Sequence, residues 1–82
     1  MITNETNPEF TLMMKRLGGL IQTKRVEKGM SITQLAKASH HRVSILRQLE
    51  CGENDNIQII QSVCGVLDMN FIELLKAAKH HD

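Results

Sequence analysis

The stretch SITQLAKASHHRVSILRQLE, residues 31–50, determines how the chain is expected to fold. Ser31 offers a hydroxyl group at the start of a helix, and Gln34 stands three residues later, where the partner in a capping box belongs. Apolar residues follow in two groups, each at the spacing of one helical face: Leu35 and Ala36, then Ile45, Leu46 and Leu49. The polar residues between these groups indicate a tight turn. The stretch therefore predicts two short helices joined by a turn, which is the helix-turn-helix arrangement.

The second of these helices is expected to present a basic face that also carries an amide group. Placing its start at residue 42 and its end at residue 50 turns five side chains outward: Arg42, Val43, Ser44, Arg47 and Gln48. Such a helix can enter the major groove of DNA, where Arg pairs with guanine, Gln with adenine and an apolar side chain with the thymine methyl group. We therefore expect these five residues to read bases.

The chain resembles the lambda-repressor-like (Cro/repressor, XRE) family of helix-turn-helix domains from about Leu12 to Lys76. The residues that carry the resemblance are RVEKGMS at 25–31, Leu35–Ala36, Ile45 or Leu46 with Leu49, Glu50 with Gly52, Asn56–Ile57, Leu67–Asn70 and Leu74–Leu75. No single motif among them is specific, and the resemblance lies in their order and spacing. It implies a compact all-α fold of five helices, with the helix-turn-helix at the second and third, and the same base-reading positions.

The resemblance also implies one contact within the domain and one between two copies. Arg25 would pair with Glu50 and tie the first helix to the end of the third, a role that suits a planar guanidinium group. The start of the fifth helix would join two copies into a homodimer, which binds a two-fold operator in double-stranded DNA. The residues expected at this dimer contact are Met69, Asn70, Phe71, Ile72 and Leu75. For Phe71, a place in the core is the alternative.

DNA phosphates are expected at the start of the helix that follows Ser31, because its free N–H groups and its dipole attract anions. Candidate phosphate contacts are Ile32, Thr33, Gln34, Lys37, Asn54 and Asn56. Residues 28–49 include four Lys or Arg and two His but no Asp or Glu, although the net charge of the whole chain is only +1. The loop after Gly52 departs from the family, whose members often carry basic residues there, because it contains Glu53 and Asp55.

The composition indicates one small domain built of helices. Hydrophobic residues make up 41% of the 82 residues but aromatic residues only 2%, so the core must consist of Leu, Ile, Val, Met and Ala. We expect the domain at residues 9–79, with flexible tails at 1–8 and 80–82. No apolar run approaches the roughly 20 residues that cross a bilayer. Residues 4–9 are too polar for a secretory signal, so the expected location is the cytoplasm, away from membranes.

Helical spacing predicts the remaining elements. We expect a first helix from about Glu9 to Glu27, with Phe10 on its apolar face, and a fourth from Ile57 to Leu67, with Ile57 on its buried face. The fifth should open at Asn70, where Glu73 would complete a second capping box. The pair Gly18–Gly19 within the first helix predicts a close contact with another helix, a kink, or a helix that begins after the pair.

The sequence shows no pattern typical of a metal site or of an enzyme. Cys51 and Cys64 are the only cysteines, and their spacing is not that of metal ligands or of a C-x-x-C motif. We therefore expect reduced thiols, no cofactor, and no zinc site with His40, His41, His80 or His81. A Gly-rich phosphate loop, paired carboxylates and a nucleophile–base arrangement are all missing, which argues against an enzyme.

Two functions compete on these grounds. The first is a dimeric, sequence-specific DNA-binding transcription regulator, either a phage-type repressor or a controller protein of a restriction–modification system. The alternative is the antitoxin of a toxin–antitoxin pair, which would bind a toxin protein and regulate its own operon. The acidic loop after Gly52 also leaves open a domain that keeps the fold but binds only protein.

Overall fold

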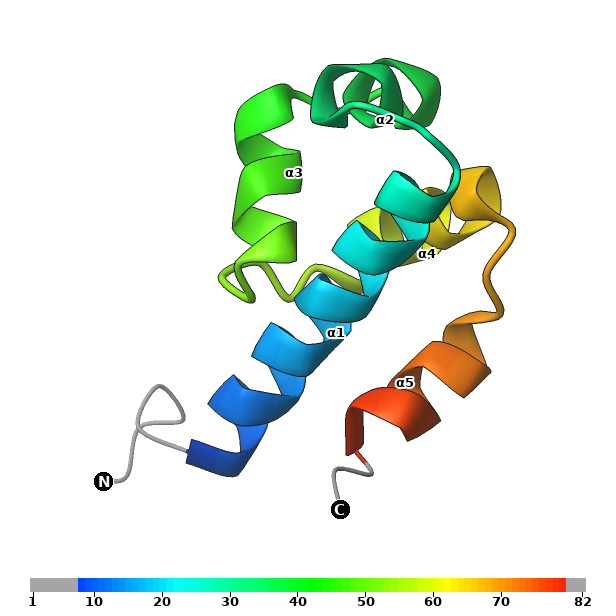
Figure 1. Ribbon diagram of the computed structural model, residues 1–82. Coiled ribbons are helices and arrows are strands. Elements are labelled where there is room, and N and C mark those ends of the chain that lie inside the picture. Colours follow the sequence, from blue (N-terminus) through cyan, green and yellow to red (C-terminus); the bar gives the residue numbers. More distant parts are fainter. Residues whose placement is uncertain (1–7, 80–82) are drawn as a thin grey trace.

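The computed structural model describes residues 8–79, and five α-helices account for most of them (Figure 1). The helices are α1 (Pro8–Glu27), α2 (Ile32–Ser39), α3 (Val43–Glu50), α4 (Ile57–Leu67) and α5 (Phe71–Lys79). Within residues 8–79 there is no β-strand, so the expectation of an all-α fold with five helices is confirmed. Pro8, which was expected in a flexible tail, is the first residue of α1. The rest of the tails expected at 1–8 and 80–82, namely residues 1–7 and 80–82, lies outside the described residues.

The long helix α1 organises the packing of the others. It contacts α3, α4 and α5, while α2 contacts α3 and α4. The pair α2–α3 therefore lies at one end of the molecule, and the start of α1 and the end of α5 lie at the other (Figure 1). No single helix in residues 8–79 is long and apolar enough to cross a membrane; α4 and α5 meet this criterion only together, with a bend of 109° between them.

The first helix of the helix-turn-helix begins with the capping box that the sequence predicts. The Oγ atom of Ser31 accepts a hydrogen bond from the Gln34 N–H at 3.0 Å, and the Gln34 side-chain oxygen accepts one from the Ser31 N–H at 2.8 Å. Both N–H groups lack a partner inside the helix, so the box satisfies them and determines where α2 starts. At the other end, His40 closes α2 in the left-handed conformation, with φ 62°.

Asparagine side chains begin the last two helices. The Asn56 side-chain oxygen accepts from the Ile59 N–H at 3.2 Å, and that of Asn70 accepts from the Glu73 N–H at 3.0 Å. Only half of the second predicted capping box is formed. The Glu73 carboxylate lies 3.9 Å from the Lys76 ammonium group, in the next turn, and does not bond back to the Asn70 N–H.

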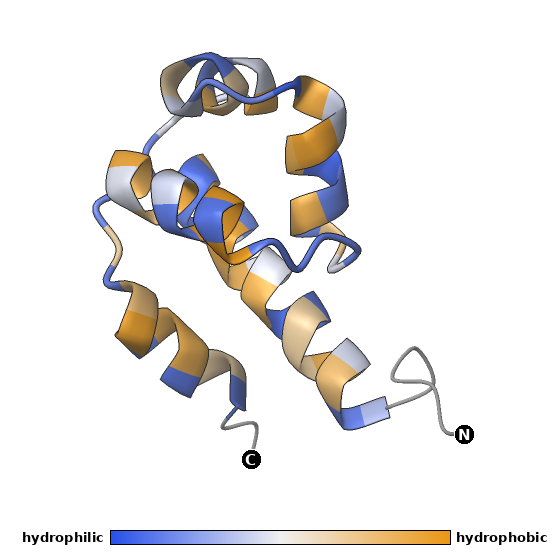
Figure 2. Ribbon diagram, turned by 180° about the vertical axis from the view of Figure 1, so that it is seen from behind, coloured by the Kyte–Doolittle hydropathy of each residue, from blue (hydrophilic) through white to orange (hydrophobic). Residues whose placement is uncertain are grey.

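The hydrophobic core draws side chains from all five helices. The largest fully buried residues are Leu17, Ile21, Leu35, Leu46, Leu49, Ile60, Val63 and Leu67. Hydrophobic and hydrophilic residues alternate along the helices, as Figure 2 shows, which is the pattern of helices with one buried face. Each such side chain contributes about 1.5–3 kcal/mol through its burial.

Two residues expected on buried faces are exposed instead. Ile57 is 51% exposed because it opens α4 almost a full turn before the first buried residue, Ile60. Phe10 is 41% exposed for the same reason, since the first buried residue of α1 is Met14. In both cases the side chain lies on the same side of its helix as the buried residues, but beyond the end of the core.

A close contact at Gly18 explains one of the two glycines in α1. A Cβ atom built on Gly18 would lie 2.4 Å from the carbonyl oxygen of Leu49 and 2.6 Å from that of Glu50. The end of α3 therefore rests directly on the backbone of α1, and α1 continues through both glycines. Of the three alternatives, the close helix contact is the one observed. At Gly19, by contrast, a Cβ atom would meet nothing within 4 Å.

This difference predicts opposite effects of alanine at neighbouring positions. Gly18→Ala should lower the free energy of unfolding by about 1–3 kcal/mol, because backbone atoms of α3 must move to admit the methyl group. Gly19→Ala should raise it by about 0.5–1 kcal/mol, because alanine favours the helix and has room there. Chemical denaturation compares the two variants, and equal stabilities would contradict the direct contact between α3 and Gly18.

Candidate functional site

Helix α3 has a buried face and an exposed face. Leu46 and Leu49 are fully buried. Four of the five residues that were expected to face outward are exposed: Arg42, Ser44, Arg47 and Gln48. Val43 is only partly exposed and packs against the core, because it lies one turn before Leu46 on the same side of the helix. The exposed face is therefore mainly polar, with two cationic residues and part of Val43.

The start of α3 has no side-chain cap. Its N-cap residue is Arg42, whose backbone is extended with φ −77° and ψ 151° and whose side chain makes no capping hydrogen bond. A guanidinium group has only donors, so it cannot accept from the first N–H groups as Ser31 and Asn56 do in α2 and α4. Its positive charge also lies at the positive end of the helix dipole. Such a departure from local stability rules is expected where a residue serves binding.

The loop after α3 reaches back to the exposed face of this helix. The Asn54 side-chain NH₂ group donates to the side-chain oxygen of Gln48 at 3.4 Å, and the Asn54 side-chain oxygen accepts from the Asn56 N–H at 3.0 Å. This contact orients the Gln48 amide and leaves its NH₂ group directed away from the bond. Asn54 and Asn56 were expected to contact phosphates, but their side-chain oxygens accept intramolecular hydrogen bonds from the backbone.

A hollow connects the exposed face of α3 with the start of α2. Its lining residues are Gln22, Arg25, Ser31, Ile32, Arg47, Glu50 and Cys51. The structure therefore brings together Arg47, expected to read a base, and Ile32, expected near a phosphate. Gln22 and Cys51 were not among the expected site residues. Gln22 is exposed three residues before Arg25, on the same side of α1, and this spacing is the signal that could have identified it.

The remaining residues expected at phosphates differ in their availability. Thr33 and Lys37 are exposed, whereas Ile32 is half-buried and packs against the core, so only its backbone can serve. The N–H group and the side-chain oxygen of Gln34 are both engaged in the capping box. In the first turn of α2, the N–H groups that lack intrahelical partners and are not used by the capping box are thus those of Ile32 and Thr33.

An ion pair between Arg25 and Glu50 holds the end of α3 in place. The Nε atom of Arg25 lies 2.7 Å from Oε2 of Glu50, its Nη2 lies 3.1 Å from Oε1, and its Nη1 donates to the Met30 carbonyl at 2.9 Å. The two side chains are only 12% and 6% exposed. Hydrogen bonding to the Glu50 carboxylate raises the pKa of Arg25. The structure thus contains the bidentate pair that the resemblance implied.

The residues expected at a dimer contact form a mixed surface. Met69, Phe71 and Leu75 are half-buried and pack against the core, and Asn70 is exposed and caps α5. Ile72 is 55% exposed. Phe71 thus contributes to the core with part of its surface, while Ile72 is the large apolar side chain of this group that solvent reaches most.

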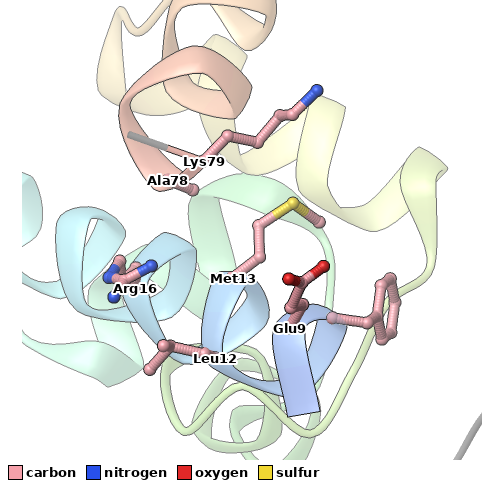
Figure 3. A pocket seen from close by; sticks show the side chains of 7 residues that line it. Glu9, Leu12, Met13, Arg16, Ala78 and Lys79 are labelled. Carbon is pink, nitrogen blue, oxygen red and sulfur yellow. The ribbon is translucent and has the colours of Figure 1, made fainter. Parts of the chain in front are cut away.

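A second hollow, with no residue of α3 in its lining, lies between the start of α1 and the end of α5 (Figure 3). Its lining residues are Glu9, Phe10, Leu12, Met13, Arg16, Ala78 and Lys79. It combines exposed apolar side chains, Phe10 and Leu12, with charged groups of both signs.

No group of three or more His, Cys, Asp or Glu side chains in residues 8–79 could hold a metal ion. Cys51 is exposed, whereas Cys64 is buried, which raises the pKa of its thiol.

Two solved structures are similar to the chain over most of its length. Both are crystal structures of the clp gene regulator ClgR from Corynebacterium glutamicum. Each is 29% identical to the chain and superposes with a TM-score of 0.74 over 82% of it; the match covers 87% of one ClgR chain and 72% of the other. No family model and no curated protein matches the chain. The likeness shows that these five helices have the fold of a gene regulator.

Because the Arg25–Glu50 pair is almost fully buried, Arg25 should contribute much more to stability than the neighbouring Lys24. Arg25→Ala should lower the free energy of unfolding by about 3–5 kcal/mol, because the Glu50 carboxylate would stay buried without a partner. Lys24→Ala should cost less than about 1 kcal/mol, since Lys24 lies 4.0 Å from Glu27 and the two side chains are 40% and 63% exposed. Thermal unfolding measures both, and equal midpoints would show that the Arg25–Glu50 pair does not hold α3.

Proposed function

We propose that the chain is a non-enzymatic, sequence-specific DNA-binding transcription regulator that inserts α3 into the major groove. The observation that carries this proposal is the exposed face of α3, on which Arg42, Arg47 and Gln48 stand opposite two fully buried leucines. The likeness to ClgR, which is named a regulator of clp genes, supports a role in gene regulation.

Recognition would divide between bases and phosphates. Arg47 can form two hydrogen bonds to guanine and Gln48 two to adenine, and each pair is worth about 1–3 kcal/mol of discrimination. Ser44 and the exposed part of Val43 complete the base-reading face. The N–H groups of Ile32 and Thr33, with the ammonium group of Lys37, would contact the adjacent phosphates.

The regulator would act as a homodimer on a two-fold operator. A single domain of this kind has few cationic contacts, and its acidic residues Glu53 and Asp55 follow α3 in the loop, so one copy should bind DNA weakly. Two linked copies would place their α3 helices in successive major grooves, about 34 Å apart. The start of α5 supports this assembly, because Ile72 exposes an apolar side chain there beside the half-buried Phe71 and Leu75.

A small domain built around a helix-turn-helix suits two kinds of regulator. These are a phage-type repressor and a controller protein of a restriction–modification system. The alternative is an antitoxin that binds a toxin protein and regulates its own operon. The hollow between α1 and α5, with exposed Phe10 and Leu12, favours such a protein partner. Co-purification of an untagged toxin with the chain would distinguish the antitoxin from a self-sufficient regulator.

Selection of bound duplexes from a random pool tests the function directly and supplies an operator. Arg47→Ala and Gln48→Ala should each relax the preference at one operator position by about 1–3 kcal/mol, because each removes one set of base contacts. Lys37→Ala is the matched control, since the loss of a phosphate contact should weaken all sequences alike. If both α3 variants bind the operator and all of its single-base changes as the parent does, α3 is not the reading helix.

The assembly is tested at Ile72. Ile72→Asp should convert the dimer to a monomer and reduce operator affinity by a factor on the order of 10²–10⁴, with little loss of helix content, because the two copies lose their effective concentration. Ala77→Asp, on an exposed position of the same helix, is the control for the added charge. Sedimentation and operator binding are measured on both. An Ile72→Asp variant that remains dimeric, or binds normally as a monomer, would contradict a dimer contact at α5.

A further inference from the structure

The turn before α3 is attached to α4 through one histidine. The Nε2 atom of His41 lies 2.7 Å from the Oγ atom of Ser62, and this hydroxyl group donates to the Ile59 carbonyl at 2.8 Å. The backbone N–H of His41 donates to the Ala36 carbonyl in α2 at 2.9 Å. The residue two positions before the start of α3 is therefore bonded to both α2 and α4.

The hydroxyl group of Ser62 can bond to the ring of His41 in either direction. A serine hydroxyl has one hydrogen, and Ser62 places it on the Ile59 carbonyl. In that arrangement its oxygen accepts from the ring. With the hydroxyl turned towards the ring, Ser62 donates to Nε2 instead, and the same two atoms stay bonded.

The bond lies beside the one helix start in the helix-turn-helix that has no side-chain cap. Arg42 cannot accept from the first turn of α3, which is held by the bonds from the Ile45 and Leu46 N–H groups to the Arg42 carbonyl, at 3.1 and 3.2 Å. The packing at this end comes from half-buried Val43 and Ile45. A lateral attachment of His41 to α4 supplies what a cap would otherwise provide, namely a defined position for the first turn.

We propose that His41, acting through Ser62, is a positioning residue for the base-reading end of α3. The bond to α4 orders the first turn of α3 and thereby allows the N-cap position to hold Arg42, a residue that binds DNA but cannot cap. The part of this inference that concerns DNA rests on the proposed function. The ordering of the first turn does not, so each can be tested without the other.

Hydrogen exchange on the protein without DNA tests the ordering. In His41→Ala and in Ser62→Ala, exchange at the Ile45 and Leu46 amides should accelerate about fivefold, the loss expected for one hydrogen bond. The double variant should show no further increase, and the Leu74 amide in α5 should not change. Additive acceleration or no acceleration would overturn the proposal.

A rescue experiment separates ordering from DNA contact. Adding Arg42→Asn to His41→Ala supplies a capping side chain, so exchange at Ile45 and Leu46 should return towards the wild-type rate while operator affinity stays low, since the guanidinium group is gone. His41→Gln, whose amide can donate to Ser62, should keep most of the affinity. Failure of Arg42→Asn to slow exchange would overturn the view that the His41–Ser62 bond replaces a cap.

Operator binding completes the test at a temperature where every variant is folded. His41→Ala should weaken binding to the selected duplex about fivefold, whereas Val66→Ala, which trims a half-buried side chain of α4, should leave it unchanged. Normal operator binding by His41→Ala would overturn the positioning role in recognition. If the wild-type chain selects no duplex at all, the proposed function fails, and the exchange data alone then decide whether His41 orders α3.

Discussion

Arg25 and Glu50 form an ion pair that joins the end of α1 to the end of α3, and the orientation of α3 depends on it. The same guanidinium group also bonds to the Met30 carbonyl, so it ties in the turn that leads to α2. Replacing such a buried pair by well-packed apolar residues often costs nothing, so its contribution is orientation more than net stability. The pair acts together with Gly18, on which the end of α3 rests without an intervening side chain. With this end attached at two points, α3 cannot rotate about its axis, and Arg47 and Gln48 remain on the outside.

The two ends of α3 are held by different means. The carboxyl end has direct backbone contact and a bidentate ion pair, whereas the amino end begins at an arginine that offers no cap. The first turn depends on half-buried Val43 and Ile45 and on the attachment of His41 to α4. At the amino end a cationic side chain thus occupies a position that local stability would assign to Ser, Asn or Asp. Arg47 and Gln48 lie in the second half of the helix, next to the end that the ion pair holds.

Charge is distributed so that one surface can attract a polyanion although the whole chain carries a net charge of only +1. The cations of residues 28–49 lie on α2, α3 and the turns beside them, and no acidic residue occurs in that window. Glu53 and Asp55 follow immediately in the loop after α3. Because exposed charges act over about 8–10 Å at ordinary ionic strength, the carboxylates of this loop reduce the attraction close to the end of α3.

Sequence alone was sufficient for those features that depend on residues close together in the chain. The bounds of α4, the capping box of α2 and the cap at Asn56 all rest on partners within four residues, so local patterns predict them. Periodicity also specifies the direction of a side chain around its helix, but it does not specify where the core ends along the helix, and for this reason Ile57 was assigned to the interior. Tertiary structure alone decided the contact of α3 with Gly18, the approach of Gln22 to Arg47, and the bond between His41 and Ser62 across 21 residues. Each of these depends on the relative placement of two helices, which the packing of the whole core determines.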